Sequence, residues 1–310
     1  MEKKEKLLIP KMDVVFRALF REDTKDLLSK LISDVLKEEI KVVTTDKSRH
    51  VNIEEANEKL GIMDLRAELE GGKQCNIEIQ LRPHKGENER ILYYWADAYR
   101  RQIRVGEYYK KLKKTISIII LDHEIEELKG MEKLGIKWQI RDEESGKRVL
   151  TDRLEIVILE IPKAKRLYKR GERNEIIEWL MFMDNPNNKE VEEIMDYNKA
   201  IKKAAEELEQ VSGDEHLRYI AELKLKGIMD EAAAMDYAEE HGYNAGFERG
   251  EKEGFEKGEK EGVKEGIKEG IKKNRIETAR NMLKENIDKD IIMKVTGLSE
   301  EEIEKIINNT

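Results

Sequence analysis

Apolar and polar residues alternate over positions 63–70 and 74–81, which predicts two β-strands joined by a short turn. In the first segment Leu65, Ala67 and Leu69 are expected to face a core. Acidic residues are depleted in strand interiors, so carboxylates held on the opposite face need a partner, and a metal ion is the partner that this pattern suggests. The polar residues of the two strands are Asp64, Arg66, Glu68, Glu70, Asn76, Glu78 and Gln80.

The turn decides how these two strands pair. A two-residue Gly-Gly loop would set polar side chains opposite apolar ones, because a slip of one residue exchanges the faces. A three-residue loop over 71–73 keeps the faces consistent and pairs Arg66 with Glu78. It also sets Asp64 opposite Gln80, which makes Asp64 and Glu78 diagonal neighbours about 7–8 Å apart at the backbone. Mg²⁺ takes oxygen ligands at about 2.0–2.1 Å and keeps several waters, so two carboxylates and a carbonyl suffice to bind it.

Periodicity in the rest of the first 163 residues predicts a mixed sheet flanked by helices, an α/β fold. Pro162 is expected to close this domain. The expected helices cover 11–20, 24–37 and 89–104, and the further strands cover 40–45, 115–122, 136–141 and 154–161.

The order and spacing of these motifs resemble the Rpn family of recombination-promoting nucleases and transposases, which share the PD-(D/E)XK nuclease core. The resemblance covers most of residues 7–163, and here glutamine takes the place of the last lysine of the core motif. The motifs that carry it are Lys11 to Phe20, Asp64, Glu78-Ile79-Gln80, Arg90 to Tyr94 and Thr115 to Leu121.

The resemblance implies a metal-dependent DNA endonuclease that promotes recombination or mobile-element movement. Asp64 and Glu78 would hold Mg²⁺, or alternatively Mn²⁺, together with the carbonyl of Ile79. Gln80 would help to position the attacking water, and Asp13 would supply a further acid. A neutral glutamine cannot stabilise the charge that develops on the phosphate as lysine would. The alternative is therefore a catalytically inactive nuclease fold that acts as a self-associating nucleic-acid-binding scaffold, and a third use of the same core is host defence.

Several of these residues also have a purely structural interpretation. Alternating acids can form an ordinary solvated face of a sheet. Asp13 can cap its helix or interact with the helix dipole. Arg66 can form an ion pair with Glu78 or Glu68 instead of taking part in catalysis. Cys75 is expected to be a small core residue.

Charge is distributed unevenly along the chain. The net charge of −8 is unfavourable for binding DNA, but residues 99–114 carry seven Lys or Arg against Glu107 alone. The apolar stripe that begins at Leu92 is expected to face the core, which leaves a polar face on the expected helix 89–104. Cations near a helix C-terminus are favourable without any ligand, so this is the competing explanation. The residues expected to contact DNA are Tyr93, Arg100, Arg101 and Arg104.

Beyond the expected nuclease-like domain (1–163) the sequence predicts helices alone, in a helical region (164–240), a glycine-repeat helix (241–273) and a small helix-turn-helix-like module (274–310). Glycine recurs at every fourth position from Gly242 to Gly270. Each glycine costs a helix about 1 kcal/mol relative to alanine, so a closely packed second copy of the helix is expected to compensate. A period of 4.0 exceeds 3.6, which favours right-handed wrapping, and a flexible charged linker is the alternative.

The last segment has good turn chemistry, with Gly297 before an N-capping Ser299 and with Glu302 three residues later. Its last expected helix opens with the acids 300–302, which would repel phosphate. We therefore interpret the segment as a packing or oligomerisation module.

Composition limits the remaining classes. The single cysteine excludes an internal disulfide framework. No apolar run reaches membrane-spanning length, and the first residues lack the apolar stretch of a signal peptide. We expect a soluble, cytoplasmic protein whose partners are DNA and further copies of itself, with no membrane contact.

Overall fold

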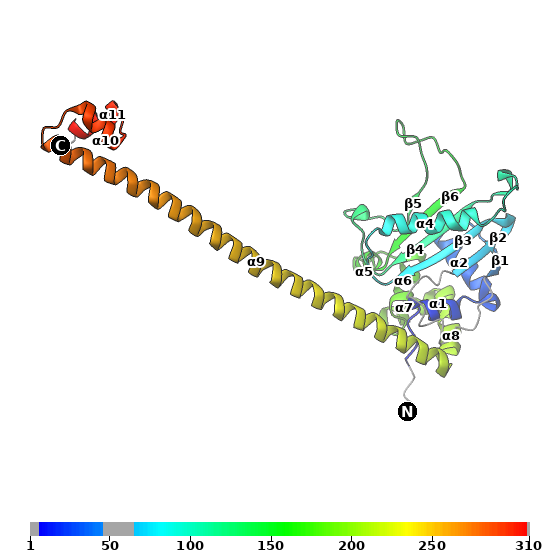
Figure 1. Cartoon of the computed structure of the whole chain (residues 1–310). Helices are drawn as coiled ribbons and strands as arrows, with labels where there is room; N and C mark the ends of the chain where they lie inside the picture. The colour runs from blue at the N-terminus through cyan, green and yellow to red at the C-terminus, as the bar shows by residue number, and fades with distance from the viewer. Residues whose placement is uncertain (1–5, 46–64, 309–310) are drawn as a thin grey trace. The chain divides into compact units, whose positions relative to one another are not determined.

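The computed structural model describes residues 6–45 and 65–308, and the chain divides into two compact units, Met1–Met229 and Asp230–Thr310 (Figure 1). Among the described residues the first unit contains a six-stranded sheet with the order β1-β2-β3-β4-β6-β5. The strands are β1 (Val42–Thr45), β2 (Leu65–Leu69), β3 (Gln74–Gln80), β4 (Thr115–Leu121), β5 (Ile136–Trp138) and β6 (Leu154–Glu160).

The centre of the sheet is parallel and its edges are antiparallel. β3 pairs with β4 and β4 pairs with β6 in parallel, whereas the β1–β2, β2–β3 and β5–β6 pairs are antiparallel. β4 and β6 are buried along their whole length, as expected of strands that are covered on both faces. The predicted mixed α/β sheet is confirmed, although the strand expected over 136–141 ends at Trp138.

Helices cover both faces of the sheet. On one face, α4 (Glu87–Arg100) packs through Ile91 and Trp95 against the apolar residues of β4 and β6. The other face carries the larger core, to which six helices and the start of α9 (Glu215–Lys284) contribute among the described residues. The six helices are α1 (Asp13–Leu19), α2 (Lys25–Leu36), α5 (Ile161–Lys169), α6 (Glu175–Asp184), α7 (Lys189–Tyr197) and α8 (Lys199–Ser212).

The larger core joins segments from both sides of position 163. The ring of Phe20 lies 6.2 Å from that of Trp179, and the core continues to Ala221. Pro162 closes the last strand, but it stands in the first turn of α5 and so begins a helix that the sequence analysis did not predict. Helices α5–α8 therefore pack as part of the first unit, and the expected boundary at 163 falls inside this unit.

The hairpin of β2 and β3 has a different register from the expected one. Arg66 pairs with Asn76, whereas we expected it to pair with Glu78. The predicted faces are correct, because a shift of two residues leaves every side chain on the same side of the sheet.

The turn explains this shift. The N–H of Leu69 donates to the carbonyl of Lys73 over 2.8 Å, so the three-residue loop is 70–72 and not 71–73. Gly71 and Gly72 both adopt left-handed conformations, with φ of 78° and 75°. Such a conformation is uncommon for a residue with a side chain, and the loop therefore closes where both glycines occupy it.

Helix α4 also differs in part from its prediction. It ends at Arg100 and not at 104, and Leu92 is 52% exposed although we expected it in the core. The buried stripe begins instead at Ile91 and continues through Trp95, whose ring stacks on Tyr99 with centroids 5.0 Å apart. The indole N–H of Trp95 donates to a carbonyl of β4 over 2.9 Å, and this bond fixes the rotation of the helix on the sheet.

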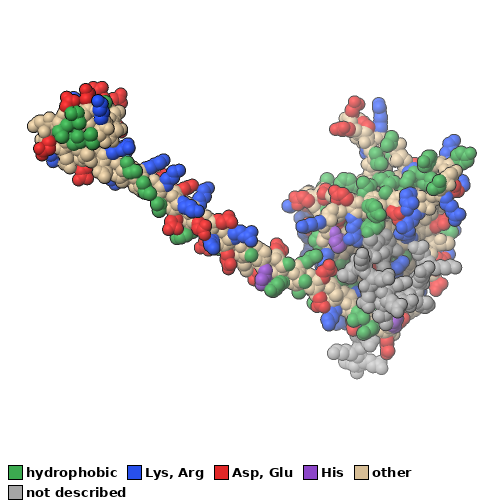
Figure 2. Space-filling model, in the orientation of Figure 1, with side chains coloured by type: hydrophobic (Ala, Val, Ile, Leu, Met, Phe, Trp, Pro, Cys, Tyr) green, Lys and Arg blue, Asp and Glu red, His purple; other side chains and the backbone are tan. Residues whose placement is uncertain are grey.

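The C-terminal half is helical, as predicted. Within the expected helical region (164–240), α7 and α8 are separated at Asn198, whose side chain accepts hydrogen bonds from the first N–H groups of α8. Helix α9 (Glu215–Lys284) contains the whole glycine repeat, and basic, acidic and hydrophobic side chains are interspersed along it (Figure 2).

The end of the second unit forms a small helical module. After α9 it contains α10 (Lys289–Thr296) and α11 (Glu300–Asn308), packed around a core that includes Ile292 and Ile303. Ser299 and Glu302 exchange the two hydrogen bonds of a capping box, as predicted. Across the described residues no helix combines the length and the apolar character needed to span a bilayer.

We expect Phe16→Ala to lower the free energy of unfolding of the first unit by about 3–5 kcal/mol, because truncation of a buried phenylalanine leaves a cavity. The ring of Phe16 is buried and lies 4.7 Å from that of Phe20. Urea denaturation followed by tryptophan fluorescence reports on this unit, since all three tryptophans belong to it. The matched control is Tyr108→Ala, at an exposed ring of the same unit, for which we expect a change below about 0.5 kcal/mol. Equal losses in the two variants would contradict the assignment of the core.

Candidate functional site

Three polar side chains of β3 line up on the face of the sheet that α4 covers. Asn76, Glu78 and Gln80 alternate with apolar residues, and their exposed fractions are only 4%, 3% and 3%. Because side chains of a strand alternate between its faces, all three point to the same side. A buried acid between two buried amides is costly unless its oxygens are satisfied, so this row is a candidate functional site.

Gln80 and Arg90 are two of the residues that hold Glu78 in place. The amide Nε2 of Gln80 donates to Oε1 of Glu78 over 3.0 Å, and the guanidinium of Arg90 forms an ion pair with the same oxygen at 3.4 Å. Arg90 comes from the second turn of α4, so the packing of this helix on the sheet sets the position of the cation. Arg90 lies in one of the motifs that resemble the family, but nothing in the sequence indicated this contact with Glu78.

One of the two alternatives for Arg66 was an ion pair with Glu78 or Glu68. Among the described residues Arg66 forms no ion pair with Glu78 or Glu68, and Arg90 takes the place beside Glu78. The register explains this difference, because Asn76 and not Glu78 lies opposite Arg66.

The predicted metal ligands are only partly visible. Asp64 lies outside the described residues, and within the described ranges no three His, Cys, Asp or Glu side chains gather as a metal site would require. Glu78 and the carbonyl of Ile79 belong to β3, and Oε1 of Gln80 has no hydrogen-bond partner within those ranges. A carboxylate, a carbonyl and an amide oxygen form an all-oxygen donor set, which suits Mg²⁺.

Asp13 stands at the first position of α1 and forms an ion pair with Lys224 of α9 at 2.5 Å. The described residues show no hydrogen bond or ion pair that joins Asp13 to Glu78 or Gln80. The structure therefore gives Asp13 a partner of its own.

Lys11, from the opening motif, connects the start of α1 to the strand ends next to Gln80. Its ammonium group lies 2.7 Å from Asp122 and 2.8 Å from Asp184, and the N–H of Asp122 donates to the carbonyl of Gln80. Burial lowers the pKa of Lys11, but its hydrogen bonds to the two carboxylates outweigh burial and hold the pKa above its usual value. Lys11 is thus a charged contact that positions the end of β3, which sequence reasoning missed.

The residues predicted to contact DNA lie on α4 and just after it. Tyr93 is 68% exposed, and the side chains of Arg100, Arg101 and Arg104 are exposed as well. Arg100 and Arg101 both form ion pairs with Asp97, at 3.0 and 2.6 Å. The segment that leads to β4 adds exposed aromatic and basic residues, namely Tyr108, Tyr109, Lys110, Lys111 and Lys113.

Two family models match the chain. The model described as PD-(D/E)XK nuclease family transposase matches residues 10–238, and the model described as Rpn/YhgA-like nuclease family, C-terminal HTH domain, matches residues 272–307. The chain therefore belongs to the PD-(D/E)XK nuclease family transposases, and the resemblance to the Rpn nucleases is confirmed. No curated protein and no solved structure gives a significant match.

The C-terminal match agrees with the helix-turn-helix pattern of the last module. The acids that open α11, Glu300, Glu301 and Glu302, are in its first turn, as the sequence analysis had them. The interpretation of this module as a packing or oligomerisation module stays a prediction.

We expect Cys75 to be unreactive toward an aromatic disulfide reagent in the folded protein at pH 8. Cys75 is buried on the face of β3 opposite Glu78, as predicted, and burial raises the pKa of its thiol to about 12. Almost no thiolate exists at pH 8, so labelling should require unfolding. Raising the pH from 7 to 9 should not make the folded protein reactive. The measurement is the absorbance of the released thiolate with and without urea. Labelling of the native protein at the rate of a small free thiol would contradict the assignment of faces.

Proposed function

We propose that this chain is a metal-dependent DNA endonuclease that acts in recombination or mobile-element movement. The observation that carries the proposal is the buried Glu78, held by Gln80 and Arg90 on a central strand of a chain that belongs to a nuclease family. Such a family membership supports cleavage of a nucleic acid, and the residues of β3 supply the chemistry.

Asp64 and Glu78, with the carbonyl of Ile79, would hold a divalent ion, Mg²⁺ or Mn²⁺. When bound, the ion lowers the pKa of a coordinated water and neutralises charge on the phosphate. Gln80 has a double role in this proposal. Its Nε2 fixes the rotamer of Glu78. Its Oε1, which has no hydrogen-bond partner among the described residues, would accept a hydrogen bond from the attacking water. We retain Asp13 as a further acid, although it would have to leave Lys224.

Arg90 would supply the positive charge that Gln80 lacks. The guanidinium is always protonated and lies 3.4 Å from Glu78, at the edge of the row that would face the phosphate. A cation beside a developing phosphate charge stabilises the transition state. In this interpretation Arg90, and not Arg66, takes over part of the role that lysine has in the family motif.

DNA would approach along α4. Tyr93, Arg100, Arg101 and Arg104 are exposed there, and the local excess of cations offsets the acidic balance of the whole chain. Aromatic rings and guanidinium groups both suit contact with nucleic acid, because rings stack on bases and guanidinium groups bind phosphate.

The same ion pair supports a second candidate, the inactive nucleic-acid-binding scaffold. Arg90 occupies Oε1 of Glu78, which a metal ion would also use, and Gln80 replaces the charged residue of the motif. If the ion pair persists in the presence of metal, the fold would bind DNA without cutting it.

We expect Glu78→Gln to reduce metal-dependent cleavage of supercoiled plasmid by at least about 100-fold, the scale seen when an electrostatic contribution to catalysis is lost. The purified full chain is assayed with Mg²⁺, Mn²⁺ or EDTA. Glu70→Gln is the matched control, because Glu70 is an exposed acid in the turn of the same hairpin and should retain activity.

Asp64→Asn should lose activity to the same degree as Glu78→Gln. Cleavage that survives both substitutions would refute the proposed site. Absence of cleavage in the unmodified protein, with DNA still bound, would favour the scaffold.

We further propose that the chain self-associates through the glycine repeat of α9. From Gly242 to Gly270 no atom of the described chain, apart from adjacent residues and the nearby backbone of the helix itself, lies within 4 Å of the position that a Cβ would take. No contact seen among the described residues therefore requires these glycines. The residues that follow the glycines are often apolar and exposed, and they are Tyr243, Phe247, Phe255, Val263, Ile267 and Ile271. A second helix that packs on this surface would bury both sets of residues.

We expect the triple variant Val263→Gln, Ile267→Gln and Ile271→Gln to weaken self-association by at least about tenfold, because burial of each aliphatic side chain contributes about 1.5–3 kcal/mol. Sedimentation equilibrium of the full chain measures the association constant. The matched control is a triple variant of the same segment in which glutamine replaces the acids Glu261, Glu265 and Glu269. A monomeric unmodified chain, or equal effects in the two triple variants, would contradict the proposal.

A further inference from the structure

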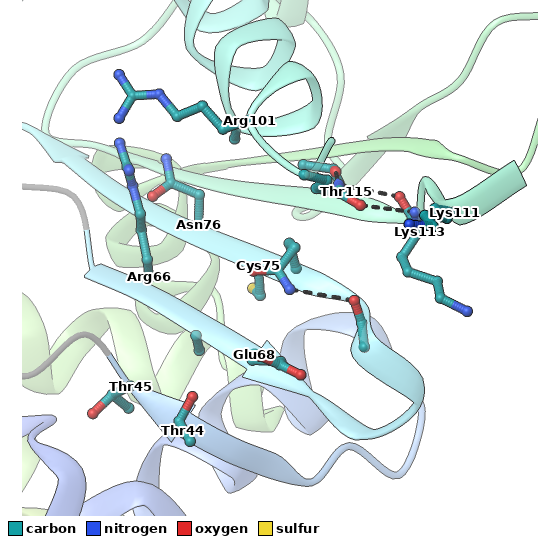
Figure 3. Close-up of a pocket in the computed structure, with 15 residues that line it drawn as sticks. Thr44, Thr45, Arg66, Glu68, Cys75, Asn76, Arg101, Lys111, Lys113 and Thr115 are labelled. Atoms are coloured by element: carbon teal, nitrogen blue, oxygen red, sulfur yellow. Dashed lines mark hydrogen bonds between the residues drawn. The ribbon is translucent and has the colours of Figure 1, made fainter. Parts of the chain in front are cut away.

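A second polar surface lies on the same face of the sheet as Glu78, toward the start of β3. It is a pocket of about 450 Å³ formed by β1, β2, β3, the end of α4 and the segment before β4 (Figure 3). Its charged and amide lining residues include Arg66, Glu68, Asn76, Arg101, Lys111 and Lys113. Neither catalysis at Glu78 nor the packing of the core explains these residues.

Two groups in the pocket have no partner among the described residues. Asn76 is 4% exposed, yet its Oδ1 has no hydrogen bond among the described residues, and Arg66, opposite it in the register, forms no ion pair among them. The orphaned atom is an acceptor, so a water or another donor would satisfy it. The Nδ2 of the same amide also forms no hydrogen bond among the described residues, and it is the atom that can donate to a ligand. The side chains of Arg66 and Arg101 extend to the side of the sheet that bears the Asn76 amide (Figure 3).

Basic side chains outnumber acidic ones in the lining of the pocket. Arg101 is already paired with Asp97, and Lys111 with Glu107. Arg66 and Lys113 are not paired with any acid of the described ranges. Glu68 is the one carboxylate among the lining residues of this pocket, and it is exposed.

An anion with several acceptor oxygens fits these groups. A guanidinium presents a planar fork of donors that matches a phosphate, and an amide adds one further donor through its Nδ2. Asn76 and Glu78 are two residues apart on one strand, which separates them by about 7 Å. This separation is comparable with that of neighbouring phosphates along a nucleic-acid strand.

We propose that Arg66, Asn76 and Arg101 bind a backbone phosphate of the DNA strand next to the phosphate that lies at Glu78. This inference rests on the proposed function for the identity of the strand, since Glu78 would face the cleaved position. The pocket contributes affinity and register, and it contributes no chemistry to the cleavage step. Binding at the pocket therefore needs no metal ion, which separates it from the site at Glu78.

The test is the binding of a fluorescent DNA duplex to the full chain in EDTA, with the salt concentration varied. We expect Arg66→Ala to weaken binding by about tenfold at low salt and to reduce the slope of log K against log salt by about 1, as the loss of one phosphate contact would. Arg66→Lys should recover part of the affinity because the charge is retained, but not all of it because the fork is lost.

The matched control is Lys203→Ala, at an exposed cation on α8, a helix of the opposite layer, which should change neither the affinity nor the slope. Thermal unfolding of each variant identifies any loss of binding that comes from a misfolded protein, and Arg66→Gln serves as a second variant if Arg66→Ala does not fold. Equal affinity and slope for Arg66→Ala and Lys203→Ala would overturn the proposal.

Cleavage and binding are measured separately, and this distinguishes the proposal from the proposed function. If the unmodified chain does not cut DNA but Arg66→Ala still binds less tightly, the phosphate site is supported and the nuclease function is refuted. If the chain cuts DNA and binding is insensitive to Arg66, the phosphate site is refuted and the nuclease function is retained.

Discussion

The parallel pairing of β3 with β4 is the constraint on which the rest of the first unit depends. β4 is buried on both faces, so its register with β3 cannot slip by one residue without placing the polar row of β3 against the large apolar core. This pairing sets Glu78 beside Ile119 and continues past the strand end, where the N–H of Asp122 bonds to the carbonyl of Gln80. Lys11 then ties the opening helix to the same point.

The faces of the hairpin could be predicted from the sequence, but its register could not be predicted completely. The alternation of polar and apolar residues has a period of two. It therefore excludes a register shift of one residue but cannot distinguish registers that differ by two. The choice between loops 70–72 and 71–73 depends on which residues adopt left-handed backbone, and both glycines do. Similarly, helical spacing was consistent with a buried stripe that begins at Leu92. In the structure the hydrogen bond from Trp95 to β4 sets the rotation of α4, and Ile91 is buried instead.

The extent of the first unit and the contact between Arg90 and Glu78 could not be predicted from local sequence patterns. Phe20 and Trp179 meet across a long stretch of chain, and no periodicity within either segment indicates the other. Arg90 reaches Glu78 only because α4 crosses the sheet at that point. The charge excess before β4 and the family motif were visible in the sequence, whereas the pocket around Arg66 and Asn76 appears only when three strands and a helix end are brought together.

The open glycines of α9 have a mechanical consequence. A helix in which every fourth residue is glycine has lost about 1 kcal/mol at each of these positions relative to alanine, and no contact within the described chain offsets that loss. Opening of this stretch therefore requires less free energy than opening of a helix of ordinary composition, and its amide hydrogens should exchange with solvent early. Taken by itself, the segment is a helix of low local stability, and a surface that covered it would raise the free energy of its opening.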